Sequence, residues 1–369
     1  MGREVRTYFN RQNEDPRYLG FKIERNGSIA QRIAHHMGLP YKPAPLFHTS
    51  PEENAYIVPG VTLDTATAAK LLIKNEADIY GVAVPNFDMI GKSILHQTVS
   101  SNTPPFYDSA FARTVEQNGL VLPGITGFSA QDLLDSYRVV GAPPSGLRLK
   151  QSNESDGNGQ HEIMGIEHLR ELLNAIGPSE LANHGAIIEP NLKQKGTNSV
   201  GFFKLGSDQY VFIADQLNGN ADERDMYLGG ENIVVTRGEF QALDDLLMRL
   251  RDPRQEIVSK AMGFLKHYFE YFPNSITSRL SVDVLSGSHA GFGKLSGVTD
   301  ITGRLGGLCP ATILAAQHLQ DNPRHEAVVA EVHLNYHPQD FQDYEKGAEV
   351  FLDQSSLRIT AKINIDKVI

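Results

Sequence analysis

A segment near the C-terminal third of the chain alternates polar and apolar side chains in the way a strand requires. In residues 279–284, the order Arg-Leu-Ser-Val-Asp-Val places Arg279, Ser281 and Asp283 on one face and three apolar side chains on the other. Residues 285–297 are rich in glycine and serine, which is typical of a turn region. These residues therefore predict the first strand of a hairpin with one chemically active face.

The second strand of this hairpin is predicted at residues 298–304, where three polar side chains alternate with other residues. If the two acids pair, the facing residues are Asp283 with Asp300, Ser281 with Thr302, and Arg279 with Arg304. Two carboxylates about 4 Å apart repel each other by roughly 4 kcal/mol at an effective dielectric constant near 20. A divalent cation between the acids reverses the sign, and Mg²⁺ in particular binds one or two carboxylates together with substrate phosphates. The alternative is a solvated outer face of a hairpin with a different register.

A lysine stands at the end of another predicted strand, just before a small polar loop. Residues 147–150 read Leu-Arg-Leu-Lys, and the loop over 151–160 contains Gly157 and Gly159. Backbone N–H groups of such a loop and the charge of Lys150 can together hold phosphates. The alternative is an ordinary turn between two strands, because glycine and asparagine are common turn residues.

Composition limits the classes of partner. The 369 residues carry a formal charge of −10, with a pI near 5.7, which argues against a nucleic-acid backbone or an anionic membrane as the main partner. No apolar run approaches the roughly 20 residues of a membrane helix. With one cysteine, Cys309, the chain cannot form an internal disulfide, and we expect it in the cytoplasm. The sequence leaves the oligomeric state open, and a homodimer is compatible with it.

The order of predicted elements suggests three parts. Residues 1–91 alternate short extended and helical runs, which indicates a parallel α/β domain. Residues 92–190 form a central domain with strands at 147–150 and 186–189 and a helix at 166–176. Residues 191–369 form a C-terminal domain with strands at 200–203 and 210–213, two helices within 239–269, and the hairpin. The predicted class is α/β, with one part of mixed α+β type.

Taken together, these pieces resemble the ATP-grasp superfamily, in particular a bacterial branch mostly without an assigned reaction, with distant similarity to D-alanine–D-alanine ligases and biotin carboxylases. The resemblance covers roughly residues 80–310 and implies an ATP-grasp fold preceded by an α/β domain. Its landmarks are two nucleotide-binding lysines, Lys92 in Gly-Lys-Ser and Lys150; a hinge segment for adenine with Glu189, Asn191 and Leu192; and a magnesium site at Asp283, Asp300 and Thr302. Asp300 and Thr302 replace the more common Glu and Asn, and the usual acidic residue for ribose is absent after the hinge.

The resemblance implies an ATP- and Mg²⁺-dependent ligase that joins a small-molecule carboxylate to an amine or similar nucleophile through an acyl-phosphate, releasing ADP and phosphate. Arg304 and Arg279 are then expected to stabilise the transferred phosphoryl group, and Arg224, Tyr227 and Glu231 are candidates for the acceptor pocket. Two alternatives stay open: a small-molecule kinase on the same scaffold, and a nucleotide-binding regulatory module without catalysis.

Overall fold

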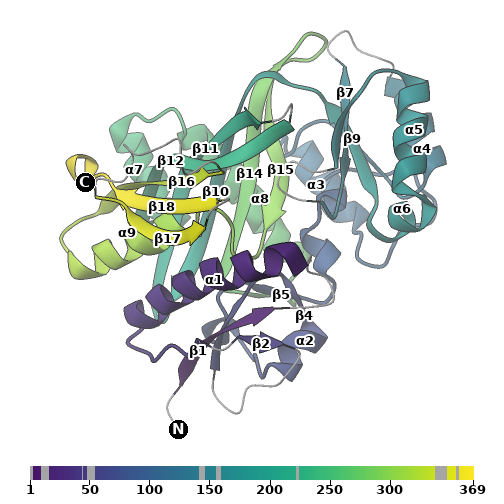
Figure 1. The fold of residues 1–369 in the computed structure, drawn as a ribbon. Helices are drawn as coiled ribbons and strands as arrows, with labels where there is room; N and C mark the ends of the chain where they lie inside the picture. Colours follow the sequence, from purple (N-terminus) through teal and green to yellow (C-terminus); the bar gives the residue numbers. More distant parts are fainter. Residues whose placement is uncertain are drawn as a thin grey trace.

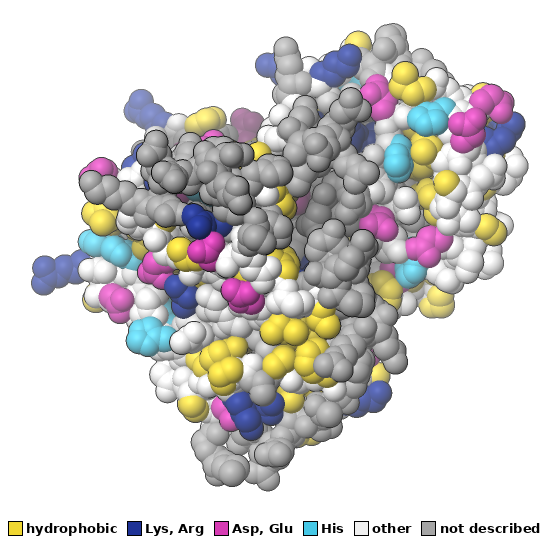
Figure 2. All heavy atoms as spheres, viewed as in Figure 1, with side chains coloured by type: hydrophobic (Ala, Val, Ile, Leu, Met, Phe, Trp, Pro, Cys, Tyr) yellow, Lys and Arg dark blue, Asp and Glu magenta, His cyan; other side chains and the backbone are white. Residues whose placement is uncertain are grey.

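The structure is a computed structural model, which describes residues 3–9, 16–43, 45–47, 55–140, 146–154, 159–221, 224–336, 347–354 and 357–369. Four sheets organise these residues, and Figure 1 shows them as three neighbouring parts of the molecule. No helix among the described residues is long and apolar enough to cross a membrane. Basic and acidic side chains are interspersed on the face that Figure 2 shows.

The N-terminal part is built on a parallel three-stranded sheet in the order β2-β1-β3, and helix α1 packs on it. This confirms the predicted parallel pairing of strands. Ile29 and Ile33 share the buried face of α1, as their spacing predicts, and Asp64 caps α2 by accepting from the backbone N–H of Thr67 at 2.7 Å. The elements are β1 (Glu4–Phe9), α1 (Pro16–His36), β2 (Leu46–Phe47), β3 (Ala55–Pro59), β4 (Leu63–Asp64), α2 (Thr65–Lys70), η2 (Glu76–Asp78) and β5 (Val82–Val84).

The central part contains a four-stranded antiparallel sheet in the order β6-β9-β7-β8, with helices α4 and α5 packed against it. Leu147 and Leu149 point into this small core, so the alternate residues of β7 point away from it. The elements from here to the end of the central sheet are η3 (Phe87–Ile90), η4 (Lys92–Ile94), α3 (Ser109–Gln117), β6 (Ile125–Gly127), α4 (Ala130–Val140), β7 (Leu147–Gln151), β8 (Gln160–Ile163), α5 (Ile166–Ile176), α6 (Pro178–His184) and β9 (Ala186–Pro190).

The C-terminal part is an eight-stranded sheet in the order β15-β14-β10-β11-β12-β16-β18-β17. Strands β10 to β12 are much longer than the short runs that the sequence predicts. The elements are β10 (Lys193–Leu205), β11 (Asp208–Ala221), β12 (Arg224–Arg237), α7 (Phe240–Leu250), α8 (Gln255–Tyr271), β13 (Ile276–Thr277), β14 (Arg279–His289), β15 (Gly293–Thr302), α9 (Cys309–Asp321), β16 (Ala327–Asn335), β17 (Glu349–Gln354), β18 (Leu357–Ile363) and η7 (Ile365–Lys367).

Helices cover both faces of this large sheet (Figure 1). On one face, α7, α8 and α3 bury aromatic and aliphatic side chains together with Val282 and Val284 of β14. On the other face, α9 and α1 pack against β11, β12 and β16. Helix α3 lies in the segment predicted as part of the central domain, yet its Phe111 packs against Phe264 of α8. The division into three domains, at residues 1–91, 92–190 and 191–369, stays a prediction.

Candidate functional site

A cavity of about 660 Å³ lies where the three parts meet, and residues from each of them line it. The predicted site residues on its wall are Lys92, Lys150, Glu189, Asn191, Leu192, Arg279, Asp283, Asp300, Thr302 and Arg304. Gly159 is not on this wall: it has a φ of +64° and closes the β7–β8 turn, its carbonyl accepting from Gln151 at 2.9 Å. Gly157 lies outside the described residues.

The predicted register of the hairpin is confirmed at its centre. Asp283 pairs with Asp300, and Ser281 pairs with Thr302, across antiparallel β14 and β15. Burial and the neighbouring Asp300 carboxylate raise the pKa of Asp283 to about 6, although Ser199 and Gln216 stabilise its charged form. Ser199 Oγ donates to Asp283 Oδ1 at 2.6 Å, and Gln216 Nε2 donates to Ser199 Oγ at 2.8 Å. The two acids thus face one another with the repulsion that the sequence predicts.

The third predicted pair, Arg279 with Arg304, takes a different form. The strand pairing ends at Ser281 and Thr302, so the two arginines are not register partners. Instead, the guanidinium group of Arg279 donates to the backbone carbonyls of Thr302, at 3.3 Å, and of Arg304. Arg279 is buried and holds the segment that follows β15, whereas Arg304 is half-buried on the cavity wall.

A β-bulge in the hairpin adds a residue to the site that simple alternation does not predict. The register shifts between Asp283 and Val284, so that Val298 pairs with Val284 while Asp300 pairs with Asp283. Thr299, the extra residue, therefore joins Asp300 on the cavity wall, and Val298 stays in the core. Strict alternation would have placed Thr299 in the core and Val298 in the cavity.

Lys150 and Glu189 form a buried ion pair between β7 and β9. Lys150 pairs with Ile187, so Glu189, two residues further along β9, is its diagonal neighbour across the ladder. His96 Nε2 lies 2.9 Å from Glu189 Oε1, and the Thr299 hydroxyl accepts a hydrogen bond from Lys150. Burial alone would raise the pKa of Glu189, but Lys150 and His96 outweigh it and lower that pKa to about 2. Glu189 is therefore ionised, and it fixes the position of Lys150.

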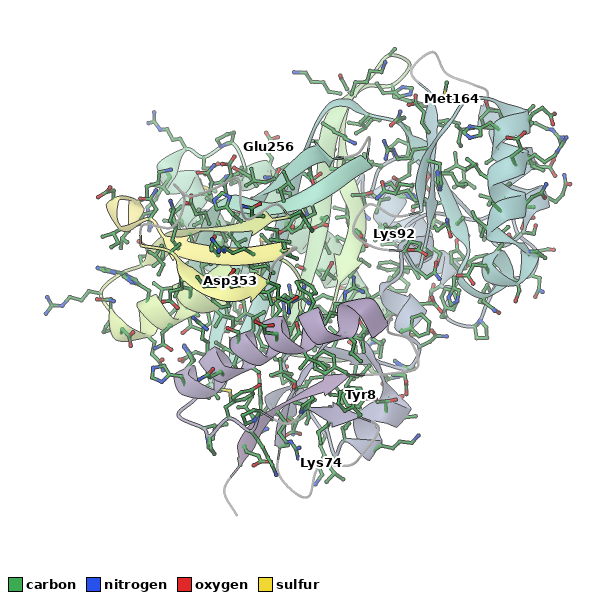
Figure 3. All side chains as sticks on the ribbon, in the orientation of Figure 1. Tyr8, Lys74, Lys92, Met164, Glu256 and Asp353 are labelled. Atoms are coloured by element: carbon green, nitrogen blue, oxygen red, sulfur yellow. The ribbon has the colours of Figure 1, made fainter. Side chains whose placement is uncertain are left out.

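Lys92 lies between the central sheet and the hairpin (Figure 3). Its Nζ donates to the carbonyl oxygen of Glu154 at 2.6 Å and lies 3.4 Å from Asp300 Oδ2. The preceding Gly91 packs closely on the residue after β7, since a Cβ at Gly91 would come within 2.9 Å of Ser152 Oγ. Ser152 Oγ in turn accepts from the backbone N–H of Ser93 at 2.8 Å. These contacts bring the two predicted lysines to the same cavity.

The predicted hinge comprises the end of β9, which contains Glu189, and the short connection to β10, which contains Asn191 and Leu192. Asn191 accepts a hydrogen bond from Arg148 Nε at 3.2 Å, and Leu192 is buried against Gly287 of β14, where a Cβ would lie 3.0 Å from Leu192 Cβ. Because the Glu189 carboxylate is committed to Lys150 and His96, the groups that the hinge can offer to a planar ring are its backbone and Leu192. Lys195 and Thr197 line the cavity after the hinge, where the sequence lacks an acid.

The acid pair fits Mg²⁺ better than a metal held by protein alone. No three His, Cys, Asp or Glu side chains gather into a metal cluster within the part of the chain that the structure describes. Two facing carboxylates, one of them with a raised pKa, are stabilised by a bound cation, but they supply few of the ligands that the cation needs. Mg²⁺ takes one or two carboxylates and completes its shell with water and substrate phosphates. Thr302 lines the cavity beside the pair.

Several residues of the site escape sequence reasoning. His96, Ser199 and Gln216 support predicted residues, but each lies in an ordinary polar context in the sequence. Arg148 stands two positions before Lys150, so the alternation that directs Lys150 toward the cavity also predicts Arg148 on the cavity wall, where it lies. Of the acceptor candidates, Tyr227 lines the cavity, Glu231 does not, and the Arg224 side chain lies outside the description.

Comparisons with known proteins agree with this architecture. The chain resembles N5-carboxyaminoimidazole synthetase from Staphylococcus aureus complexed with ADP, with a TM-score of 0.52 and 12% identity over 98% of this chain and 93% of that chain. It also resembles the biotin carboxylase domain of 2-oxoglutarate carboxylase from Hydrogenobacter thermophilus, in complex with ADP, magnesium and bicarbonate, with a TM-score of 0.53 and 9% identity over 97% of this chain and 86% of that chain. A synthase of the first kind from Aspergillus clavatus, in complex with ADP and an aminoimidazole ribonucleotide, has a TM-score of 0.50 and 12% identity over 97% and 94% of the two chains.

These solved structures have the ATP-grasp fold, and the chain shares it, as the sequence predicts. No curated protein sequence matches the chain. The sequence profile of one family matches residues 11–359, nearly the whole length. The chain therefore belongs to the family described as "Protein of unknown function (DUF3182)" and has the ATP-grasp fold.

Proposed function

We propose that the protein is an ATP- and Mg²⁺-dependent ligase that joins a small-molecule carboxylate to an amine or similar nucleophile. The observation that carries the proposal is the meeting of two buried lysines and a facing acid pair in one cavity. The acid pair does not stabilise an empty cavity. Buried lysines lose hydration, and paired carboxylates repel each other, so both gain when a metal-bound polyphosphate lies between them.

Different residues of the cavity would then bind different parts of the nucleotide. The hinge backbone and Leu192 hold adenine at one end of the cavity. Lys150, oriented by Glu189, and Lys92, oriented by the Glu154 carbonyl, hold the phosphates. Asp283, Asp300 and Thr302 would bind Mg²⁺, which neutralises charge on the phosphate oxygens when it is bound. Positioning and charge neutralisation are the main means by which proteins accelerate phosphoryl transfer.

The proposed reaction has two steps. A carboxylate oxygen of the acid substrate bonds to the γ-phosphorus as the bond to the β-phosphate oxygen breaks, which gives an acyl-phosphate and ADP. The amine nitrogen then bonds to the acyl carbon, phosphate leaves with its electron pair, and the amine proton passes to solvent or phosphate. Arg304, half-buried on the wall, would stabilise the transferred phosphoryl oxygens. Arg279 would act as a positioning residue, because it binds the carbonyl oxygen of Arg304.

The test is release of ADP from ATP with pooled acids and pooled amines, added separately and together, with mass detection of products. A ligase releases ADP only when an acid is present and gives a condensed product when an amine is added. A kinase releases ADP with an alcohol and yields a stable phosphate ester. Tight ATP binding without ADP in any pool would contradict the ligase and favour a binding module.

A further inference from the structure

Arg148 lines the cavity near the hinge, and the proposed reaction does not use it. It lies on β7, two residues before Lys150, so both side chains point to the cavity face of the central sheet. Strand β7 is flanked by β8 on one side and by β9 on the other. The half-buried Arg148 side chain therefore lies on an inner strand, between the hinge and the lysine that would hold phosphate.

Two hydrogen bonds hold the guanidinium group of Arg148 flat against this sheet. Its Nε donates to Asn191 Oδ1 at 3.2 Å, and its Nη1 donates to Gln160 Oε1 at 3.3 Å. Asn191 directly follows β9 and Gln160 begins β8, so the two acceptors come from opposite sides of β7. All N–H donors of a guanidinium group lie in its plane. Acceptors on both sides therefore hold this plane along the sheet surface, which leaves a flat face turned toward the cavity.

The hairpin forms the wall opposite β7, and the two are joined at two places. Lys150 donates to the hydroxyl of Thr299 on β15, and the carbonyl oxygen of Gly146 lies 3.0 Å from His289 Nε2 on β14. Figure 1 shows the central sheet beside these two strands. Because Arg148 is two residues from Gly146 and two from Lys150, it lies midway between the two contacts. It is thus placed across the cavity from the middle of the hairpin.

The middle of the hairpin is apolar where it meets the hinge. Leu285 of β14 lines the cavity two residues beyond Asp283. Gly287, two residues further, lies against Leu192 of the hinge, since a Cβ at Gly287 would lie 3.0 Å from Leu192 Cβ. Leu192 also lines the cavity. At this level the cavity therefore has a flat cation on one wall and aliphatic side chains on the other.

A guanidinium group in this position suits a planar ring better than a phosphate. In the proposed function the phosphates lie at Lys150 and the acid pair, and two strand residues separate Arg148 from Lys150 by roughly 7 Å. Two of the Arg148 nitrogens already donate to amide oxygens. Guanidinium groups are planar and weakly hydrated, and they stack on aromatic rings and on nucleic-acid bases, whereas an ammonium group has no flat face. The flat face is therefore the main feature that Arg148 offers to a ligand.

We infer that Arg148 is the stacking platform for the nucleotide base, and that it makes the site select purine over pyrimidine nucleotides. The inference rests on the proposed function for the presence of a nucleotide in the cavity, but not for the ligase reaction. The base lies between the Arg148 guanidinium group and Leu285, with its edge at the hinge backbone. A two-ring purine covers more of the guanidinium group than a one-ring pyrimidine does, so stacking stabilises the bound purine more.

The test compares the binding of magnesium-bound ATP and CTP by calorimetry. Adenine and cytosine both present an amino group beside a ring-nitrogen acceptor, so the hinge backbone can bind either edge, and ring size is the main difference. We expect the unmodified protein to bind ATP about tenfold or more tightly than CTP. Arg148→Lys keeps the positive charge but removes the flat face. In this variant ATP binding should weaken about fivefold or more, and CTP binding by no more than about twofold.

A second variant, Arg148→Phe, separates stacking from the other roles of an arginine. Phenylalanine keeps a flat face but has no charge and cannot bond to Asn191 or Gln160, so we expect this variant to bind ATP within about threefold of the unmodified protein. A role in binding phosphate or in bracing the hinge would instead make Arg148→Phe bind ATP more weakly than Arg148→Lys does. Arg170→Lys is the matched control, because Arg170 belongs to the same part of the molecule but pairs with Glu167 at 3.0 Å and does not line the described cavity wall. It should leave the affinity for both nucleotides unchanged.

Three results would overturn the inference: no preference for ATP over CTP in the unmodified protein, an unchanged ATP affinity or equal losses of ATP and CTP affinity in Arg148→Lys, and weaker ATP binding by Arg148→Phe than by Arg148→Lys. The first two decide the matter even if Arg148→Phe does not fold. Absence of binding of either nucleotide to the unmodified protein would overturn the inference and the proposed function together. Binding that follows these expectations, without ADP release in any pool of acids and amines, would contradict the ligase alone.

Discussion

Asp283 and Asp300 stand directly opposite each other on β14 and β15, and the pKa of Asp283 is raised to about 6 by burial and by that neighbour. A carboxyl group with a raised pKa costs folding free energy when it ionises, because the unfolded chain ionises it more easily. The pair is therefore a local weakness of the ligand-free protein, and a site that a cation would strengthen.

This weakness has a defined pH dependence. Between pH 3.8, the ordinary value, and about 6, the folded protein binds the Asp283 proton more tightly than the unfolded chain does. Stability from this group is thus present below pH 3.8 and declines as the pH rises toward 6. We expect Asp283→Asn to raise the free energy of unfolding at pH 8 by up to about 3 kcal/mol, and to have little effect near pH 3.8. Urea unfolding at both pH values measures this.

The matched control is Asp353→Asn, which removes an exposed carboxylate that pairs with Arg358 at 3.0 Å. Its effect should stay within about 0.5 kcal/mol at both pH values. If Asp283→Asn destabilises the ligand-free protein at pH 8, the two acids do not repel each other in the way the register requires.

Glu189 should give the opposite pH dependence. Its pKa falls to about 2, below the ordinary 4.5, despite its burial, because Lys150 and His96 favour the charged form. The stability it contributes is present above pH 4.5 and is lost as the pH falls toward 2. We expect Glu189→Gln to reduce the loss of stability between pH 4.5 and pH 3 by up to about 2 kcal/mol, measured by urea unfolding. An unchanged slope in that range would mean that Glu189 is not ionised in the folded protein.

The ion pair between Lys150 and Glu189 leads to a prediction that joins stability and ATP binding. Lys150→Ala leaves a buried carboxylate without its cation, so we expect a loss of about 3 kcal/mol in the free energy of unfolding. The double variant Lys150→Ala/Glu189→Gln should recover most of that stability. Its affinity for ATP should nevertheless stay at least tenfold lower than that of the unmodified protein, since the charge that holds phosphate is gone. Recovery of ATP affinity in the double variant would assign Lys150 a structural role only.

Thr299 tests the contribution of the β-bulge. Thr299→Val keeps the shape of the side chain but removes the hydroxyl that accepts from Lys150. We expect ATP affinity to fall several-fold, at a cost of about 1 kcal/mol, and Thr299→Ser to restore it. Calorimetric titration with magnesium and ATP measures both variants. Equal affinities for the Val variant and the unmodified protein would show that the bulge does not position Lys150.

The sequence predicted the elements that depend on local pattern. Alternation placed Ser281 and Asp283 on one face of β14, and the apolar residues Leu280, Val282 and Val284 on the other face are in the core as expected. The facing of Asp283 and Asp300 was also predictable, because the polar residues of both strands need a common face. Lys150, near the end of β7, was predicted from its position just before a small polar loop.

Other features depend on contacts distant in the sequence. The bulge at Thr299 shifts the register by one residue, and alternation cannot reveal an extra residue in a strand. His96 lies 93 positions from Glu189, and Arg25 reaches the cavity only because the N-terminal part packs against the segment after β15. The resemblance supplied roles for single residues, but not the partners that orient them.

The most direct test of the acid pair is the gain in ATP affinity that Mg²⁺ provides. Calorimetry measures ATP binding with excess Mg²⁺ and with EDTA, on the unmodified protein and on Asp300→Asn. We expect the unmodified protein to bind ATP at least tenfold more tightly with Mg²⁺. In Asp300→Asn this gain should fall to within twofold. The free energy of unfolding of the ligand-free variant should equal or exceed that of the unmodified protein. An equal Mg²⁺ gain in both proteins, or no binding of ATP to the unmodified protein, would contradict the assignment of the acid pair to magnesium-bound ATP.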